Sequence, residues 1–573
     1  MVCTPLLSKP QLGCRMALSE GSERLAGEPK LAQHDDEEPA GPPLWVGSSE
    51  ALGGYSLRSF AGLLSGAALT GALTGLGVAT FKASVAMLAG TLYGEPAVEN
   101  GMAASDAAVL PWYTFFIPAA GGLAVAVLRA ACGPEGLGPN LAGHVAEMTS
   151  GKQPQPVASV SRTAAAVATL GSGCSLGPEG PAVEWGMFTS RTVEQLLEAP
   201  VLGVGSDAAQ NLRFRRQLLA AGAASGVAAG FNAPLAGIVF ALEVVSDNVV
   251  LAARQEAKSV AEATAGADPS MARSSAIQNV VAAASADAEL DVKGKASLSM
   301  ITIASLVSAI VVDVTLGQEL ALRPGGVMPT PELQELPAYL LLCVALGSAS
   351  GGVAVGLSRA TALVRDLFAA GEDGNAGLLA PMPEWLRPAA GGFFCGAIGL
   401  FFPEVLFFGY STLDAILAGV NGGEMRGADP KVALDAIMLL GAKLAATSIC
   451  LGAGLVGGTF APSLFLGAVL GVAFHAAANF GLDAAIDSLA QLGLSDLATY
   501  LPHLSVADRT SFASIGAAAT LAAVFRAPLT ASLLIFELTR GYELVLPLLA
   551  AAGVGPLISI TFDEARKRDA TKR

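Results

Sequence analysis

Gly222–Glu243 reads GAASGVAAGFNAPLAGIVFALE, and Gly516–Glu537 reads GAAATLAAVFRAPLTASLLIFE. Laid over each other without a gap, the two segments agree at 10 of 22 positions, including the Phe-x-Ala-Pro-Leu core and the final Glu. Each consists of an apolar run, an interruption at Pro and a second apolar run. Helices broken in this way are stable inside a membrane only where protein or a water-filled path covers the exposed backbone. The pair predicts a chain of two related membrane-embedded halves.

A second pair of segments supports the repeat. Gly171–Gly186 (GSGCSLGPEGPAVEWG) and Gly452–Gly467 (GAGLVGGTFAPSLFLG) agree at 5 of 16 positions. All of these are Gly or Pro, the residues that dictate the path of a backbone. Because both pairs occur in the same order at similar spacing, chance similarity between Ala-rich segments does not explain them. We therefore assign one membrane repeat to residues 56–250 and the other to residues 296–560.

The composition is that of a polytopic membrane protein. Charged residues make up 14% of the 573 residues, against about 25% in typical soluble proteins, and hydrophobic residues make up 53%. Gly is abundant and aromatic residues are only 6%, which favours closely packed helices. A net charge of −15 argues against a nucleic-acid partner. With four His and no CxxC pair, we expect neither a metal site nor a disulfide framework. The predicted fold class is all-α, with two helical repeats and broken half-helices.

Polar segments flank and separate the two repeats. Residues 1–55 are predicted to be a disordered tail, although Lys9 and Arg15 without an early acid leave open a remnant of an organelle presequence. Residues 251–295 are expected to be an Ala/Ser-rich extramembrane linker. Residues 561–573 are expected to be a short charged tail, with no nucleotide-binding modules.

The chemistry of the helix breaks points to an anion. In Gly177–Pro181 and Gly458–Pro462 a Gly-rich turn precedes a Pro and an apolar run. Pro suits a first helical turn, where the remaining N–H groups have no intrahelical partner and the positive end of the helix dipole faces the turn. Two such ends that meet at the midplane form an anion site without a Lys or Arg side chain.

Glu179 lies at the first of these breaks. A carboxylate there is costly inside a membrane and is therefore a functional candidate. As a tethered competitor it can occupy the anion site and leave when protonated; a buried acid that caps a helix start is the alternative. Glu243 and Glu537 end the repeated apolar helices, and the sequence leaves open whether they are functional or structural.

At these motifs the sequence resembles the CLC family of chloride channels and anion/proton antiporters, from about Ser56 to Ile560. The motifs, in the family's order, are LGPEGP (Leu176–Pro181), FNAPLAGIVFALE (Phe231–Glu243), GGTFAP (Gly457–Pro462) and FRAPLT (Phe525–Thr530). The resemblance implies that the two helical repeats are antiparallel (inverted). It also implies a homodimer in the lipid bilayer, with one anion pore per subunit and bound chloride rather than a cofactor. The GPEGP form is similar to the branch found in plant organelles and cyanobacteria, which suggests an intracellular organelle membrane, such as that of a plastid.

The resemblance also assigns roles to residues of the anion path. Glu179 matches the gating glutamate. Backbone amides of Thr459 and Phe460 match those of the central anion site, with Gly180 and the neighbouring Gly177 at the outer site.

The remaining filter motif best matches residues 136–140, in which Leu137 and Gly138 become anion-binding candidates. Leu137 stands where the family has a Ser associated with chloride or a Pro associated with nitrate. Because Leu137 offers no hydroxyl, we expect weak discrimination between the two anions.

Two further departures concern the mechanism. Val244 occupies the position of the second Glu that relays protons in familiar antiporters, and Val cannot bind a proton. Glu243 and Glu184 are the candidate substitutes for proton coupling. No Tyr follows Tyr542, so either the inner constriction is built differently or the family's final helix lies outside this sequence.

Three functions are weighed on these grounds. A voltage- or pH-gated chloride channel accounts for the repeat, the half-helices, Glu179 and Val244. A chloride (or nitrate)/proton antiporter accounts for all except Val244. A membrane-embedded enzyme is disfavoured because His144 and His475 have no metal-ligand spacing.

Overall fold

A computed structural model describes the part of the chain that carries the repeats. The described residues are 57–94, 112–132, 136–202, 208–265, 291–317, 336–368, 377, 379–417, 430–491 and 509–572. Within these ranges the protein has 17 α-helices and no strand. Eight helices are long and apolar enough to cross a membrane. The predicted all-α membrane fold is confirmed.

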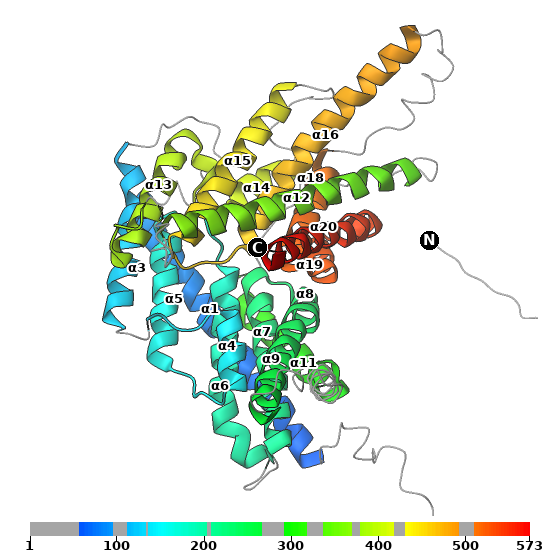
Figure 1. The fold of residues 1–573 in the computed structure, drawn as a ribbon. Coiled ribbons are helices and arrows are strands. Elements are labelled where there is room, and N and C mark those ends of the chain that lie inside the picture. Colours follow the sequence, from blue (N-terminus) through cyan, green and yellow to red (C-terminus); the bar gives the residue numbers. More distant parts are fainter. Residues whose placement is uncertain are drawn as a thin grey trace, which may run out of the picture. The chain divides into compact units, whose positions relative to one another are not determined.

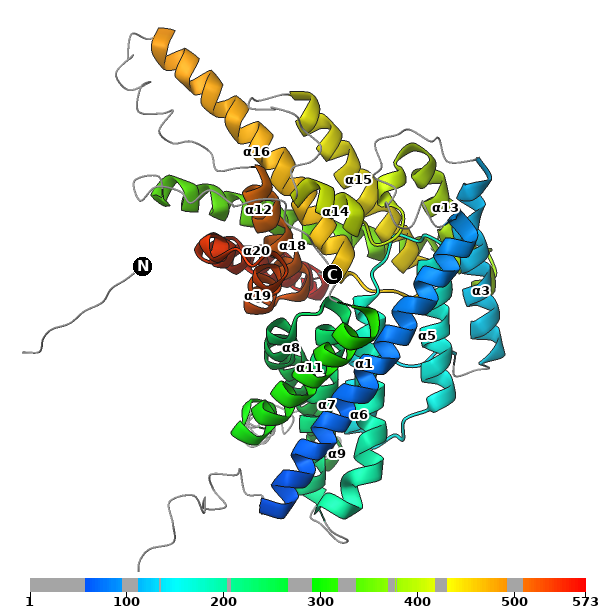
Figure 2. The same cartoon turned by 180° about the vertical axis from the view of Figure 1, so that it is seen from behind.

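The helices of the first half surround a central pair, α6 and α7. Their bounds are α1 (Leu57–Tyr93), α3 (Ile117–Ala131), α4 (Leu141–Thr149), α5 (Pro156–Gly171), α6 (Glu179–Leu202), α7 (Ala208–Phe231), α8 (Pro234–Phe240), α9 (Ser246–Ala265) and α11 (Lys295–Leu316). A single π-helical turn, Ala241–Val245, joins α8 to α9. The long α1 packs along α11, α6 and α7, as Figure 2 shows. Because α11 packs mainly on α1 and α7, we place it with the first half, although the sequence analysis began the second repeat at residue 296.

The second half repeats this order. Its helices are α12 (Leu336–Phe368), α13 (Arg387–Phe401), α14 (Tyr410–Leu417), α15 (Pro430–Gly452), α16 (Phe460–Gln491), α18 (Arg509–Phe525), α19 (Pro528–Thr539) and α20 (Val545–Lys572). Here α16 and α18 form the central pair that corresponds to α6 and α7.

Helices α3 and α13 reveal a third repeated segment that the sequence analysis missed. Both begin with Pro-Ala-Ala-Gly-Gly, at residues 118–122 and 388–392, and they lie side by side (Figure 1). Their contacts are reciprocal: a Cβ at Gly122 would overlap the carbonyl of Pro388, and a Cβ at Gly392 would overlap that of Pro118. The glycines therefore allow the two backbones to touch. Because the contacts are reciprocal, an approximate two-fold axis relates the two halves.

The breaks between α7 and α8 and between α18 and α19 also have the same backbone geometry. Asn232 and Arg526 occupy equivalent positions and have nearly identical left-handed φ angles of 56° and 57°. Residues other than glycine rarely adopt this backbone conformation, and here each of the two residues redirects the chain between two helices. The inverted repeat is thus visible in backbone geometry as well as in sequence.

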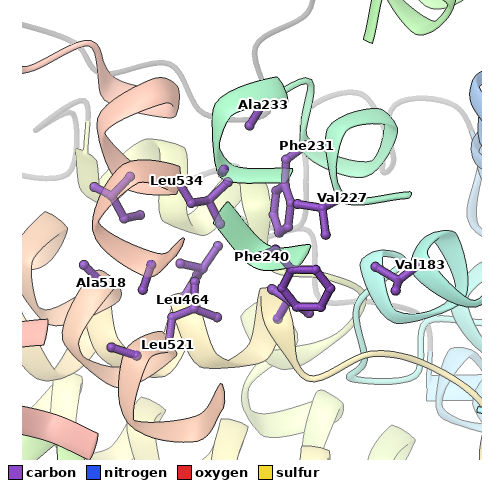
Figure 3. Packing of buried hydrophobic residues seen from close by; sticks show 14 of the residues in the cluster. Val183, Val227, Phe231, Ala233, Phe240, Leu464, Ala518, Leu521 and Leu534 are labelled. Atoms are coloured by element: carbon purple, nitrogen blue, oxygen red, sulfur yellow. The ribbon is translucent and has the colours of Figure 1, made fainter. Parts of the chain in front are cut away.

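The main core lies where the halves meet. Figure 3 shows Val227 and Phe231 of α7 and Phe240 of α8 facing Leu464 of α16 and Leu534 of α19. Ala and Gly are frequent in α7, α16 and α18, which lets these helices approach closely. The packing fixes the relative position of the first turns of α6 and α16.

The boundaries of the polar segments differ from the expectation. The supposed linker begins as α9, which runs on to Ala265, and residues 561–572 continue α20 instead of forming a separate tail. The predicted tail at 1–55 and residues 266–290 of the linker lie outside the described residues.

Candidate anion site

The two Gly-rich breaks meet as the sequence predicts. Gly177 and Gly458 form an isolated antiparallel bridge, in which the Gly177 N–H donates to the Gly458 carbonyl at 2.8 Å and the Gly458 N–H donates back at 2.7 Å. A Cβ at Gly458 would lie 2.6 Å from the amide nitrogen of Gly180. Only glycine permits this approach, which brings the first turns of α6 and α16 together.

Three of the predicted anion-binding amides are available at this junction. The N–H groups of Gly180, Thr459 and Phe460 have no hydrogen-bond partner among the described residues. They lie at the starts of α6 and α16, where the helix dipoles add positive potential. The arrangement offers an anion several N–H donors and no full positive charge in direct contact.

Two other predicted amides are already engaged. Gly177 donates to the bridge, and the Gly138 N–H donates to the Ala158 carbonyl at 3.1 Å. Neither is free to bind an anion in this structure. We therefore revise their predicted role: these amides hold the backbone of the site in place. The side chain of Leu137 is partly buried and packs on a second core cluster near α5.

Glu179 is fully buried at the first turn of α6. Its Oε1 accepts a hydrogen bond from the Tyr410 hydroxyl, at the start of α14. Its Oε2 has no hydrogen-bond partner in the described part of the chain, and the Ala461 backbone amide of α16 faces the carboxylate. The acid thus lies against the helix end that an anion would also use.

Lys82 of α1 extends toward the surroundings of the Glu179 carboxylate. Its ammonium donates to the carbonyls of Ala229 and Gly230 at the end of α7, at 3.0 and 2.5 Å. A Cβ at Gly230 would lie 3.7 Å from Cγ of Glu179, so the two carbonyls adjoin the acid. The ammonium and the Glu179 carboxylate attract each other electrostatically.

A second cation, Lys443 of α15, is fully buried behind the start of α14. Its ammonium donates to the carbonyls of Val405 and Phe407 at 2.9 and 3.1 Å and lies 4.9 Å from the centre of the Phe465 ring. It makes no ion pair with a carboxylate among the described residues. Lys443 therefore adds positive potential near Tyr410.

Glu184 has a different environment from Glu179. Both of its carboxylate oxygens accept from the Arg162 guanidinium, at 2.6 and 2.8 Å. Arg162 also donates to the Gly138 carbonyl at 3.3 Å. This pair ties α5 and α6 to the loop that contains Leu137.

Glu243 and Glu537 each cap the start of a helix in the other repeat. Glu243 accepts from the backbone N–H groups of Leu529 and Thr530 at the start of α19, at 3.1 and 2.7 Å. Glu537 accepts from those of Leu235 and Ala236 at the start of α8, at 2.9 and 2.7 Å. The structure thus favours the structural role for both acids. Val244, next to Glu243 in the π-helical turn, packs against the main core.

Thr459 and Phe460 connect the amides to their surroundings. Thr459 borders a cavity of about 370 Å³, which is also lined by Arg365, Arg526 and Asp563. The Phe460 ring stacks on Phe525 with the ring centres 3.9 Å apart. An anion can approach the amides from the cavity, while the ring fills the space behind them.

The matched family agrees with this geometry. The family described as "Voltage gated chloride channel" matches residues 121–559, which include both breaks and all the candidate amides. The chain belongs to this family. The CLC resemblance carried by the sequence motifs is thereby confirmed.

Two relatives and one solved structure are similar to the chain. Chloride channel protein CLC-e of Arabidopsis thaliana is 34% identical over 401 residues, 70% of this chain and 46% of that protein. The H(+)/Cl(−) exchange transporter ClcA of Vibrio cholerae is 30% identical, over 66% of this chain and 62% of its own length. The chain spans less than two thirds of both relatives. A slow cyanobacterial Cl−/H+ antiporter shares the fold, with a TM-score of 0.59 and 19% identity over 87% of this chain and 95% of that one.

Sequence reasoning overlooked Lys82, Tyr410 and Lys443. A signal for the two lysines was present, because an ionisable residue inside an apolar membrane helix is a functional candidate by default. Lys82 and Lys443 lie within the apolar spans Phe60–Tyr93 and Lys431–Gly452. Tyr410 carries no such signal, since its role depends on how α14 packs beside α6.

Proposed function

We propose that this protein is a CLC-type anion channel that passes chloride or another small monovalent anion across a membrane, with Glu179 as the gate. The observation that carries the proposal is the position of the buried Glu179 carboxylate beside the Ala461 amide at the start of α16, which directly follows the unpaired amides of Thr459 and Phe460 in the chain. A charged carboxylate there competes with an anion for the same donors. A protonated or displaced side chain leaves the donors to the anion.

The hydrogen bonds that the other acids already make favour a channel over an antiporter. An antiporter needs a second acid that delivers protons to the gate from the other side of the membrane. Val244 cannot do this, and both oxygens of Glu184 and of Glu243 already bind an Arg side chain or backbone N–H groups. Neither substitute acid can exchange protons without giving up structural hydrogen bonds.

A chloride/proton antiporter is the second candidate. It is supported by relatives that carry the name H(+)/Cl(−) exchange transporter and by Glu179, a buried protonatable group in the proposed path. In both functions the chemistry is transport through a bilayer, with no enzymatic step and no cofactor. We further propose, from the GPEGP motif, an organelle membrane as the location.

Reversal potentials separate the two candidates. The purified chain is reconstituted in planar bilayers, and the reversal potential is measured under opposed chloride and pH gradients. A channel reverses at the chloride equilibrium potential whatever the pH gradient. A reversal potential that moves with the pH gradient overturns the channel and establishes the antiporter.

A further inference from the structure

Tyr410 and Lys82 approach the gate from opposite halves of the molecule. Tyr410 is the first residue of α14 in the second half, and Lys82 lies in α1 of the first half. The phenol donates to Glu179 Oε1, while the ammonium is held next to the same carboxylate by the carbonyls of Ala229 and Gly230. Neither residue belongs to a motif that suggested the anion path.

We infer that Tyr410 and Lys82 are positioning residues for the gate: both hold charged Glu179 in its blocking position, and both pass their interactions to an anion when the side chain leaves. The inference rests on the gating role of Glu179 proposed above. For Tyr410 the physical basis is that a hydrogen bond to a charged acceptor is stronger than one to a neutral acceptor. For Lys82 it is that a nearby opposite charge favours the charged form of an acid. The two residues therefore stabilise the carboxylate more than the carboxylic acid.

The ammonium of Lys82 has a second consequence. In the closed state the Glu179 carboxylate is its nearest described counter-charge, because its direct partners are neutral carbonyl groups. When Glu179 takes up a proton, Lys82 keeps its positive charge at the end of α7. An anion that enters the vacated position replaces the carboxylate as the counter-charge, and the Tyr410 hydroxyl becomes free to donate to it.

Few other charged or titratable groups face this cluster in the described structure. Asp414, also on α14, acts electrostatically on Tyr410. On α15, the Lys443 nitrogen lies 3.5 Å from the Cβ position of Gly409. The helices α7 and α16 present backbone groups to Glu179. On α6, Glu184 is neutralised by Arg162.

The test measures the pH dependence of chloride efflux from liposomes that contain the full chain. Tyr410→Phe and Lys82→Met each remove one stabiliser of the charged gate, so Glu179 should bind a proton more readily. We expect the midpoint of pH activation to move upward by about one pH unit, a tenfold change in proton affinity. Lys82→Arg, which keeps the charge, should retain the wild-type midpoint if it folds.

Tyr93→Phe is the matched control for the tyrosine. The Tyr93 hydroxyl donates to the Ser172 carbonyl at 2.9 Å and not to Glu179, so its removal should leave the midpoint unchanged. A merely structural role for Tyr410 or Lys82 would lower the thermal stability and leave the midpoint at its wild-type value. That result, in variants that elute as monodisperse protein, overturns the inference.

The claim that an anion takes over the interactions of the carboxylate is tested in a background that lacks the Glu179 carboxylate. By calorimetry, Lys82→Met added to Glu179→Ala should weaken chloride binding about tenfold relative to Glu179→Ala alone, which is about 1.4 kcal/mol. Unchanged affinity overturns the exchange of counter-charges. If Glu179→Gln itself keeps the wild-type pH dependence, the proposed gate fails. If Glu179→Gln abolishes that dependence while Tyr410→Phe and Lys82→Met keep the wild-type midpoint, only the inference about these two residues fails.

Discussion

At the scale of single residues, three glutamates that look alike in the sequence have different surroundings. Glu184 is held by a guanidinium, and Glu243 by the first turn of a helix. Glu179 has one protein donor and one unsatisfied oxygen beside free amides. Buried polar atoms usually have a hydrogen-bond partner, so the unpaired oxygen distinguishes Glu179 from the other two acids and agrees with its proposed role as the gate. The motif pointed to Glu179, but only the packing separates it from the other two.

Leu137 gives a prediction at the same scale. Its side chain packs on the second core cluster and offers no hydroxyl, and the neighbouring Gly138 amide is engaged. Apart from the Tyr410 hydroxyl and the Lys82 charge, the site then relies on backbone N–H groups, which favour anions without distinguishing them sharply. We expect chloride and nitrate permeabilities to differ by less than about tenfold, or ~1.4 kcal/mol. Bi-ionic reversal potentials measure this ratio, and a larger preference for either anion would assign selectivity to another residue.

At the scale of elements, the broken helices were predictable because Gly and Pro constrain the backbone locally. The starts of α6, α8, α16 and α19 all follow such breaks. The exchange of caps between the halves was not predictable. It depends on contacts between residues almost three hundred positions apart, as in Glu243 to Thr530. The position of α14, and with it Tyr410, is also set by tertiary packing alone.

The caps lead to a prediction about stability. Glu243→Gln and Glu537→Gln each replace a charged acceptor of two backbone N–H groups with a neutral one. We expect each to lower the free energy of unfolding by about 1–3 kcal/mol, since hydrogen bonds to charged groups contribute that much. Thermal unfolding in detergent, followed by tryptophan fluorescence, measures the loss. Efflux by either variant should keep the wild-type pH dependence; a loss of that dependence would make the acid part of the proton pathway.

At the scale of the whole molecule, composition and the internal repeat were enough to predict a helical membrane protein of two related halves, and the CLC resemblance added that the halves are inverted. The reciprocal contacts of α3 with α13 agree with that arrangement. Less was predictable about the ends of the elements, because an Ala/Ser-rich segment such as α9 can continue a helix without the apolar signal that the analysis followed. The assembly of subunits was also not predictable from the pattern alone, because an apolar helix face does not show which surface it packs against.

A homodimer remains a prediction at this scale. Leu235 of α8 and Leu529 of α19 follow the repeated Pro and are about half exposed, at 47% and 54%. Leu298 and Ile310 of α11 and Leu546 of α20 extend this apolar surface. We expect these helices to form the subunit interface, as the CLC resemblance implies. Native mass spectrometry from a mild detergent should give twice the mass of the chain, and a single-chain mass would contradict the dimer.

The gating role of Glu179 is tested most directly by chloride efflux from liposomes as a function of pH, with the wild type, Glu179→Gln and Glu243→Gln compared. Gln has the size of Glu and mimics its protonated form, which cannot compete with the anion. We predict that Glu179→Gln conducts at every pH without pH dependence, while the wild type and the Glu243→Gln control open as the pH falls. If Glu179→Gln conducts normally and keeps the wild-type pH dependence, Glu179 is a structural cap and the proposed gate is wrong.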